Sequence, residues 1–78
     1  MSRLVKKIFD LGYYHFAYNM FEKRFNSHQI IISIDEDDKT IRDYYLKSFV
    51  VSKGDLVDSE KAYELMQKDL EILKECEE

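Results

Sequence analysis

Residues 29–34 constrain the fold more than any other part of the chain, because four of the six are isoleucine. Branching at Cβ favours the strand conformation, and the run is too short to form a helix of its own. The polar residues 35–39 that follow are typical of a turn, and apolar character then resumes. We therefore expect a β-hairpin whose second strand begins near residue 40 and extends as far as Val51. The alternation breaks at Arg42 and Asp43, which predicts a bulge there.

Residues 40–51 also have an alternative interpretation. Ile41, Tyr45 and Phe49 recur at a spacing that would place them on one face of a helix. We favour the strand, because a strand over residues 30–34 alone would lack the hydrogen-bonding partner that its backbone needs.

The C-terminal residues predict an amphipathic helix over about 58–75. Its apolar side chains recur at the i, i+3 and i+4 spacing that lines one helix face: Ala62, Leu65, Met66, Leu70 and Leu73. Asp58 or Ser59 could cap the first turn, and residues 53–55 before it are expected to form a loop. Glutamates at the end of this helix oppose its dipole, so we expect it to fray there.

The first 25 residues are less distinct. Polar and apolar side chains separate onto two faces over residues 2–11, which predicts a short helix. After Gly12 the pattern shifts, and residues 13–25 could form either a second helix or a strand. The abundance of tyrosine and phenylalanine in this segment favours the strand.

Together these elements predict one small domain over residues 1–78, of the α+β class. The expected order is α-β-β-β-α, with a three-stranded antiparallel meander and both helices on one face. The alternative is a helical N-terminal half, a β-hairpin and the C-terminal helix. A chain of 78 residues has room for a single small core.

Composition limits how so small a core could be reinforced. Cys76 is the only cysteine, so no disulfide can form within the chain, and the two histidines lie far from it in the sequence. We therefore expect no zinc site and no cofactor, and aromatic packing or self-association as the reinforcement. The missing disulfides, the absence of a signal peptide and the absence of a long apolar run predict an intracellular, cytoplasmic protein without a membrane segment.

The charge is unevenly distributed along the chain. The net charge is −4, but residues 1–34 carry five basic and two acidic side chains, whereas residues 35–78 carry seven basic and fourteen acidic ones. The acidic balance argues against direct nucleic-acid binding, which needs cations to neutralise phosphates. It favours a basic partner surface instead.

The acidic run at residues 35–38 is the densest charge cluster. It does not match a calcium loop, which would need glycine at the sixth position and glutamate at the twelfth, where this chain has Thr40 and Leu46. We expect no metal here. The run is either a solvated turn or a surface that binds a basic protein.

Tyrosines form a second candidate group, because exposed tyrosines are effective binding anchors whereas buried ones only build the core. Tyr44 and Tyr45 follow the acidic turn closely and could extend a binding surface. No pairing of nucleophile and base and no glycine-rich phosphate loop is evident, so we expect a protein that is not an enzyme.

The short length, the absence of proline and the acidic second half resemble the small acidic proteins that phages encode to inhibit host defence. The anti-CRISPR proteins are the best-known group. Residues 29–34 leading into residues 35–38 resemble the strand and acidic loop of one anti-Cas9 inhibitor. The resemblance implies a phage or mobile-element protein that mimics DNA, placing carboxylates where phosphates would lie. The basic first half departs from a fully acidic mimic.

The sequence thus predicts a non-enzymatic inhibitor or regulator that acts in the host cytoplasm. Its acidic surface would block the basic, nucleic-acid-binding site of a larger host protein or nucleoprotein complex. The alternative is a homo-oligomeric assembly protein, most simply a homodimer. The residues expected to contact the partner are acidic or aromatic: Asp35, Glu36, Asp37, Asp38, Asp43, Tyr44, Tyr45, Glu64, Asp69 and Glu71.

Overall fold

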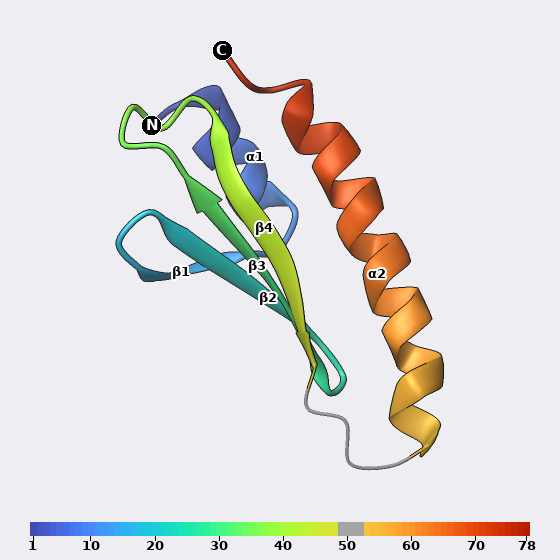
Figure 1. Cartoon of the computed structure of the whole chain (residues 1–78). Helices are drawn as coiled ribbons and strands as arrows, with labels where there is room; N and C mark the ends of the chain where they lie inside the picture. The colour runs from blue at the N-terminus through green and yellow to red at the C-terminus, as the bar shows by residue number, and fades with distance from the viewer. Residues whose placement is uncertain (49–52) are drawn as a thin grey trace.

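The computed structural model describes the backbone of residues 1–48 and 53–78, and the side chains of residues 1–48 and 58–78. The elements follow in the order α1 (Arg3–Asp10), β1 (Tyr14–Ala17), β2 (Met20–Phe25), β3 (His28–Ile34), β4 (Ile41–Ser48) and α2 (Lys53–Lys74). Figure 1 shows α2 running alongside the sheet while α1 lies behind the strands. The predicted α+β class and the order of helix, strands and helix are confirmed.

The sheet has four antiparallel strands in the order β1-β2-β3-β4, one more than the meander we expected. The segment predicted as one strand over residues 13–25 turns back on itself at Tyr18 and Asn19. Asn19 has a φ of 56°, in the left-handed region that asparagine tolerates better than most residues. This turn was not predicted, because it contains no glycine or proline that would mark it in the sequence.

The predicted hairpin formed by β3 and β4 is confirmed, including its irregularity. Ile34 pairs with Ile41 but Ser33 pairs with Asp43, so Arg42 is the extra residue of a bulge. Residues 49–51, which the predicted second strand included, lie outside the described residues.

The predicted N-terminal helix is present, and α1 begins and ends one residue inside the predicted range of residues 2–11. Ser2 precedes it as the N-cap, and the Ser2 hydroxyl accepts a hydrogen bond from the Val5 amide at 3.1 Å. Gly12 lies in the connection to β1 and has a φ of +94°, a conformation in which a side chain would be strained.

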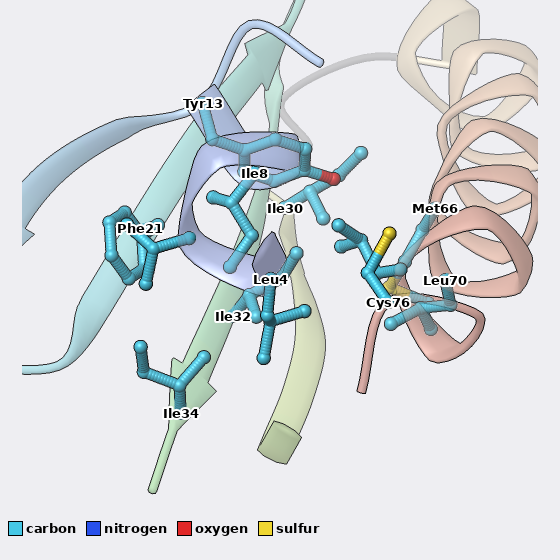
Figure 2. Packing of buried hydrophobic residues seen from close by; sticks show 12 residues of the cluster. Leu4, Ile8, Tyr13, Phe21, Ile30, Ile32, Ile34, Met66, Leu70 and Cys76 are labelled. Carbon is cyan, nitrogen blue, oxygen red and sulfur yellow. The ribbon is translucent and has the colours of Figure 1, made fainter. Parts of the chain in front are cut away.

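The core lies between one face of the sheet and the two helices (Figure 2). Because side chains alternate along a strand, β3 contributes Ile30, Ile32 and Ile34 to this face. The remaining buried side chains of the cluster come from both helices, β2 and the segments next to them: Leu4, Val5, Ile8, Tyr13, Phe21, Met66, Leu70, Leu73 and Cys76. Both helices therefore pack on the same face of the sheet, as predicted.

Helix α2 begins at Lys53, so the loop predicted at residues 53–55 and the cap predicted at residue 58 or 59 are wrong. The two proposed capping side chains contact the β2–β3 hairpin instead. The Asp58 carboxylate accepts a hydrogen bond from the Asn26 amide at 3.0 Å, and the Ser59 hydroxyl lies 3.4 Å from Nε2 of the buried His28.

Candidate functional site

The acidic turn, residues 35–38, is held in one shape by its own carboxylates. The Asp35 carboxylate accepts hydrogen bonds from the Thr40 hydroxyl and from Nε of Arg42, the latter at 3.0 Å. These bonds, with Thr40 contributing more than Arg42, lower the pKa of Asp35. Asp37 accepts a hydrogen bond from the Lys39 amide at 3.0 Å. Two of the four acidic residues, Asp35 and Asp37, therefore stabilise the turn through their side chains, while Glu36 is exposed and Asp38 is half-buried.

Residues from both ends of the described chain fasten this turn to the body of the protein. The Ser2 hydroxyl donates to the Asp38 carbonyl at 2.6 Å, and the Glu78 amide donates to the Lys39 carbonyl at 3.0 Å. The Glu77 carboxylate accepts from the Ile41 amide at 3.0 Å. The result is an acidic end of the molecule, in which six acidic side chains gather around three basic ones: Asp35, Glu36, Asp37, Asp38, Glu77 and Glu78 with Arg3, Lys39 and Arg42.

The face of the sheet opposite the core, here called the open face, carries an ordered row of side chains. The strand registers align Tyr14 with Glu22, Glu22 with Ile31, and Ile31 with Tyr45. Both helices pack on the other face, yet Glu22 and Ile31 are only 6% and 5% exposed. The outer members Tyr14 and Tyr45 are 46% and 42% exposed. This row therefore presents two aromatic rings to solvent around a buried centre.

Neutral hydrogen-bond donors hold the buried Glu22 carboxylate in place. The Tyr14 hydroxyl donates to Glu22 Oε1, and the Gln29 side-chain amide donates to Glu22 Oε2. The Arg24 guanidinium is more distant, with Nε 3.9 Å from Oε1. The hydrogen bond to the carboxylate raises the pKa of the Tyr14 hydroxyl, because the carboxylate stabilises the protonated phenol. The Tyr14 ring is thereby fixed in orientation, which is a useful property in a binding anchor.

A hollow of about 260 Å³ connects the acidic turn to the open face. It is lined by Glu36 of the turn and by Tyr18, Met20, Ser33 and Arg42, among others. Met20 and Ser33 pair with each other, and Ser33 also pairs with Asp43, so this row is the one next to Tyr14 and Tyr45 on the open face. The acidic turn and the tyrosines thus belong to one continuous surface.

The structure divides the predicted contact residues into separate groups. The acidic turn, Asp43 and Tyr45 lie on this continuous surface. Tyr44 is partly exposed but pairs with Ile32, so its side chain is on the core side of the sheet. Glu64 and Glu71 are exposed on α2, on which Lys61, Lys68 and Lys74 are exposed too. That helix surface has mixed charge and does not extend the acidic turn.

Asp69 is not on the surface at all, since it is only 4% exposed. Its Oδ2 atom lies 2.6 Å from Nζ of Lys23 and accepts a hydrogen bond from the Tyr13 hydroxyl at 2.9 Å. Lys23 also donates to the Leu11 carbonyl at 2.9 Å and lies 4.7 Å from the centre of the Tyr13 ring. Burial, and next the Asp69 charge, raise the pKa of Tyr13. Asp69 therefore ties α2 to β2 and cannot meet a partner.

The spacing within α2 contained a signal for this outcome. Asp69 lies three residues after Met66 and next to Leu70, and so falls on the apolar face of the helix. The sequence pattern indicated less clearly that Tyr14, Glu22 and Gln29 belong to the open face. It depends on the turn at Tyr18 and Asn19, because only that turn brings Tyr14 opposite Glu22.

The described residues offer little that resembles a catalytic or metal centre. Among them no three His, Cys, Asp or Glu side chains are grouped so that they could hold a metal ion. Within the same part of the chain no helix has the length and apolar character needed to cross a membrane. Comparison with known proteins finds no matching family model, no matching curated sequence and no matching solved structure.

Proposed function

We propose that this protein is a non-enzymatic binding protein that inhibits or regulates a larger protein with a basic surface. The contact surface would consist of the acidic turn, the hollow beside Glu36 and the tyrosines of the open face. It would use Asp43 and Tyr45 from the predicted set, and not Glu64, Asp69 or Glu71.

The observation that carries this proposal is the number of hydrogen bonds that hold the acidic turn. A solvated turn needs no fastening, but here hydrogen bonds from Thr40, Arg42 and Lys39 fix the turn internally. Others from Ser2 and Glu78 hold it against the rest of the chain. A turn whose backbone is held in this way loses little further entropy when its carboxylates meet cations, and the exposed tyrosine rings next to it supply apolar contact area.

The kind of target follows from the charge and from the resemblance noted above. A fixed group of carboxylates fits a site that normally binds phosphates, and the similarity to anti-CRISPR proteins is the ground for naming a host defence protein. A phage or mobile-element origin and action in the host cytoplasm belong to the same proposal. Complementary charges of this kind increase the rate of association, and the affinity falls as salt screens the charges.

The turn itself suggests how to test the contribution of its charge. Glu36→Gln with Asp38→Asn removes two negative charges from the turn and keeps its shape, because asparagine tolerates the φ of 60° found at Asp38. Glu64→Gln with Glu71→Gln removes two exposed charges from α2 and serves as the matched control.

A photo-cross-linking residue placed at position 36, and separately at position 64, would capture the partner in lysate of the source cells. The captured protein would then be purified and its affinity measured by calorimetry for both double variants at several salt concentrations. We expect the turn variant to bind at least about tenfold more weakly and with less salt dependence, and the helix variant to bind normally. Equal binding of both variants, or capture only from position 64, would overturn the proposal.

A further inference from the structure

Strand β4 forms one edge of the sheet, and its outward-facing backbone groups can be identified from the register. The Ile34 amide donates to the Asn19 carbonyl at 2.9 Å, on the β2 side, so even-numbered residues of β3 direct their backbone groups toward β2. Odd-numbered residues, such as Ile31, then bond to β4, where Ile31 pairs with Tyr45. It follows that Tyr44, Leu46 and Ser48 direct their amides and carbonyls outward from the edge.

One observed contact agrees with this assignment. The Tyr44 amide donates to the Asp43 carboxylate at 2.8 Å, so it does not depend on β3 for its hydrogen bond. Long edges of this kind attract a further strand unless they are blocked. The eight residues of β4 include no proline, and four of the seven from Arg42 to Ser48 carry no charge: Tyr44, Tyr45, Leu46 and Ser48.

The sequence of β4 is complementary to itself when the strand is reversed. If two copies pair in antiparallel fashion with Tyr45 opposite Tyr45, Asp43 of each copy lies opposite Lys47 of the other. Tyr44 then lies opposite Leu46, and these two outward-facing residues form the hydrogen-bonded pair. Opposite charges in facing positions stabilise a strand pair. We propose that two copies of this chain associate through β4 and form one continuous eight-stranded sheet.

A groove beside β4 fits the side chain that this pairing would bring. The groove has a volume of about 440 Å³ and lies between the edge strand and α2, lined by Leu46, Ser59, Glu60, Tyr63 and Glu64. Tyr44 of the second copy would be opposite Leu46 and on the core side of the sheet, so its ring would enter this groove. The partial exposure of Tyr44 in the single chain is thereby explained.

Pairing would also exchange one contact of Asp43 for another. In the single chain the Asp43 carboxylate satisfies the Tyr44 amide. In the dimer that amide would donate to the Leu46 carbonyl of the second copy, and the carboxylate would turn to Lys47 of that copy. Both copies would keep their helices on the same side of the joined sheet, since the two-fold axis runs perpendicular to it. This inference does not depend on the proposed function.

Charge exchange at positions 43 and 47 tests the register directly. Asp43→Lys alone, or Lys47→Asp alone, places like charges opposite each other twice per dimer. We expect each single variant to raise the dimer dissociation constant by roughly tenfold or more in sedimentation equilibrium under reducing conditions. The double variant, Asp43→Lys with Lys47→Asp, restores the pairs and should dimerise like the unmodified protein. An equimolar mixture of the two single variants should form a heterodimer.

A second measurement identifies the interface even if a charge variant folds poorly. Tyr45 would face its counterpart in a non-hydrogen-bonded pair, with Cα atoms about 4.5 Å apart, which is within reach of a disulfide. With Cys76→Ser in the background, Tyr45→Cys should give a disulfide-linked dimer on mild oxidation, and Tyr14→Cys at the opposite edge should not.

Three results would overturn the inference: a monomer at every concentration, a dimer whose affinity ignores the charge exchanges, or equal cross-linking at positions 14 and 45. The double variant Glu36→Gln with Asp38→Asn should leave dimerisation unchanged. Loss of partner binding in that variant together with an intact dimer would show that the two proposals are separate.

Discussion

Ile31 and Ile32 are neighbours in β3 and are almost equally buried, at 5% and 0% exposed, but they lie on opposite faces of the sheet. Ile32 packs in the core cluster with side chains of α1 and α2, whereas Ile31 lies on the open face, where it pairs with Glu22 and Tyr45. Each side of the sheet also has a buried carboxylate: Asp69 of α2 on the core side and Glu22 of β2 on the open face. Asp69 is paired with a lysine, while Glu22 is held mainly by neutral donors. The comparison shows that equally buried side chains can have different roles. On the core side they join the helices to the sheet, and on the open face they support side chains that are exposed to solvent.

The largest difference between the faces should appear when each isoleucine is truncated. Ile32→Ala would leave a cavity that the two helices cannot fill, and we expect a loss of about 4 kcal/mol in the free energy of unfolding. Ile31→Ala should cost about 1–2 kcal/mol, because water and the neighbouring tyrosine rings can occupy the space. Urea denaturation followed by circular dichroism measures both losses. Equal losses would mean that the open face is packed as tightly as the core.

The two buried carboxylates provide the next comparison. Asp69→Asn would leave the Lys23 ammonium, which has only 17% of its side chain exposed, without its anionic partner. We expect a loss of about 3 kcal/mol in the free energy of unfolding. Replacing both members of the pair, Lys23→Met with Asp69→Leu, should recover most of that loss, since no buried charge would remain. If the double variant is no more stable than Asp69→Asn, the pair does more than neutralise Lys23.

The corresponding change on the open face should be milder. Glu22→Gln keeps the shape and an acceptor oxygen for Tyr14, so we expect a loss of only about 1 kcal/mol. The pKa of the Tyr14 hydroxyl, now raised by the Glu22 carboxylate, should move back toward its ordinary value. A pH titration of the Tyr14 ring signals by NMR measures this shift, with Tyr63 as an exposed reference. An unchanged pKa would show that Tyr14 does not bond to Glu22 in solution.

The smallest expected effect concerns the acidic turn and depends on pH. The pKa of Asp35 in the folded protein lies below its ordinary value of 3.8, so the stability it contributes is present above that value. It is lost as the pH falls through the lowered pKa of the folded state. The melting temperature of Asp35→Asn should therefore lie below that of the unmodified protein at neutral pH, and the two should converge below pH 3.8. A constant difference at all pH values would contradict this assignment.

Local patterns predicted the elements whose contacts are close in sequence. The β3–β4 hairpin and the bulge at Arg42 followed from the isoleucine run, the polar turn and one break in alternation. Helix α1 followed from its two faces. The division of residues 13–25 into β1 and β2 did not, because only the backbone of Asn19 marks that turn. The early start of α2 was missed because Asp58 and Ser59 look like caps but contact the β2–β3 hairpin.

The candidate surface was predicted less completely than the fold. The acidic turn was found from its charge alone, although the sequence did not show that Asp35 and Asp37 stabilise it. Asp69 was predicted to be on the surface because it is charged. Its position on the apolar face of α2 indicated instead that it would be buried. Tyr14 and Glu22 were missed, since their proximity depends on strand register rather than on composition.

The sequence by itself determined the α+β class, the single small core, the hairpin and the concentration of acidic residues in the second half of the chain. Those properties depend on side-chain type and on spacing within one element. Only the tertiary structure decided which carboxylates are exposed, which are buried and which shape the acidic turn. The burial of Asp69 and the attachment of the turn to the rest of the chain depend on contacts between residues distant in sequence, such as Lys23 with Asp69 or Ser2 with Asp38. The uneven charge of the chain thus becomes one fixed acidic end and one buried ion pair, rather than a uniformly acidic surface.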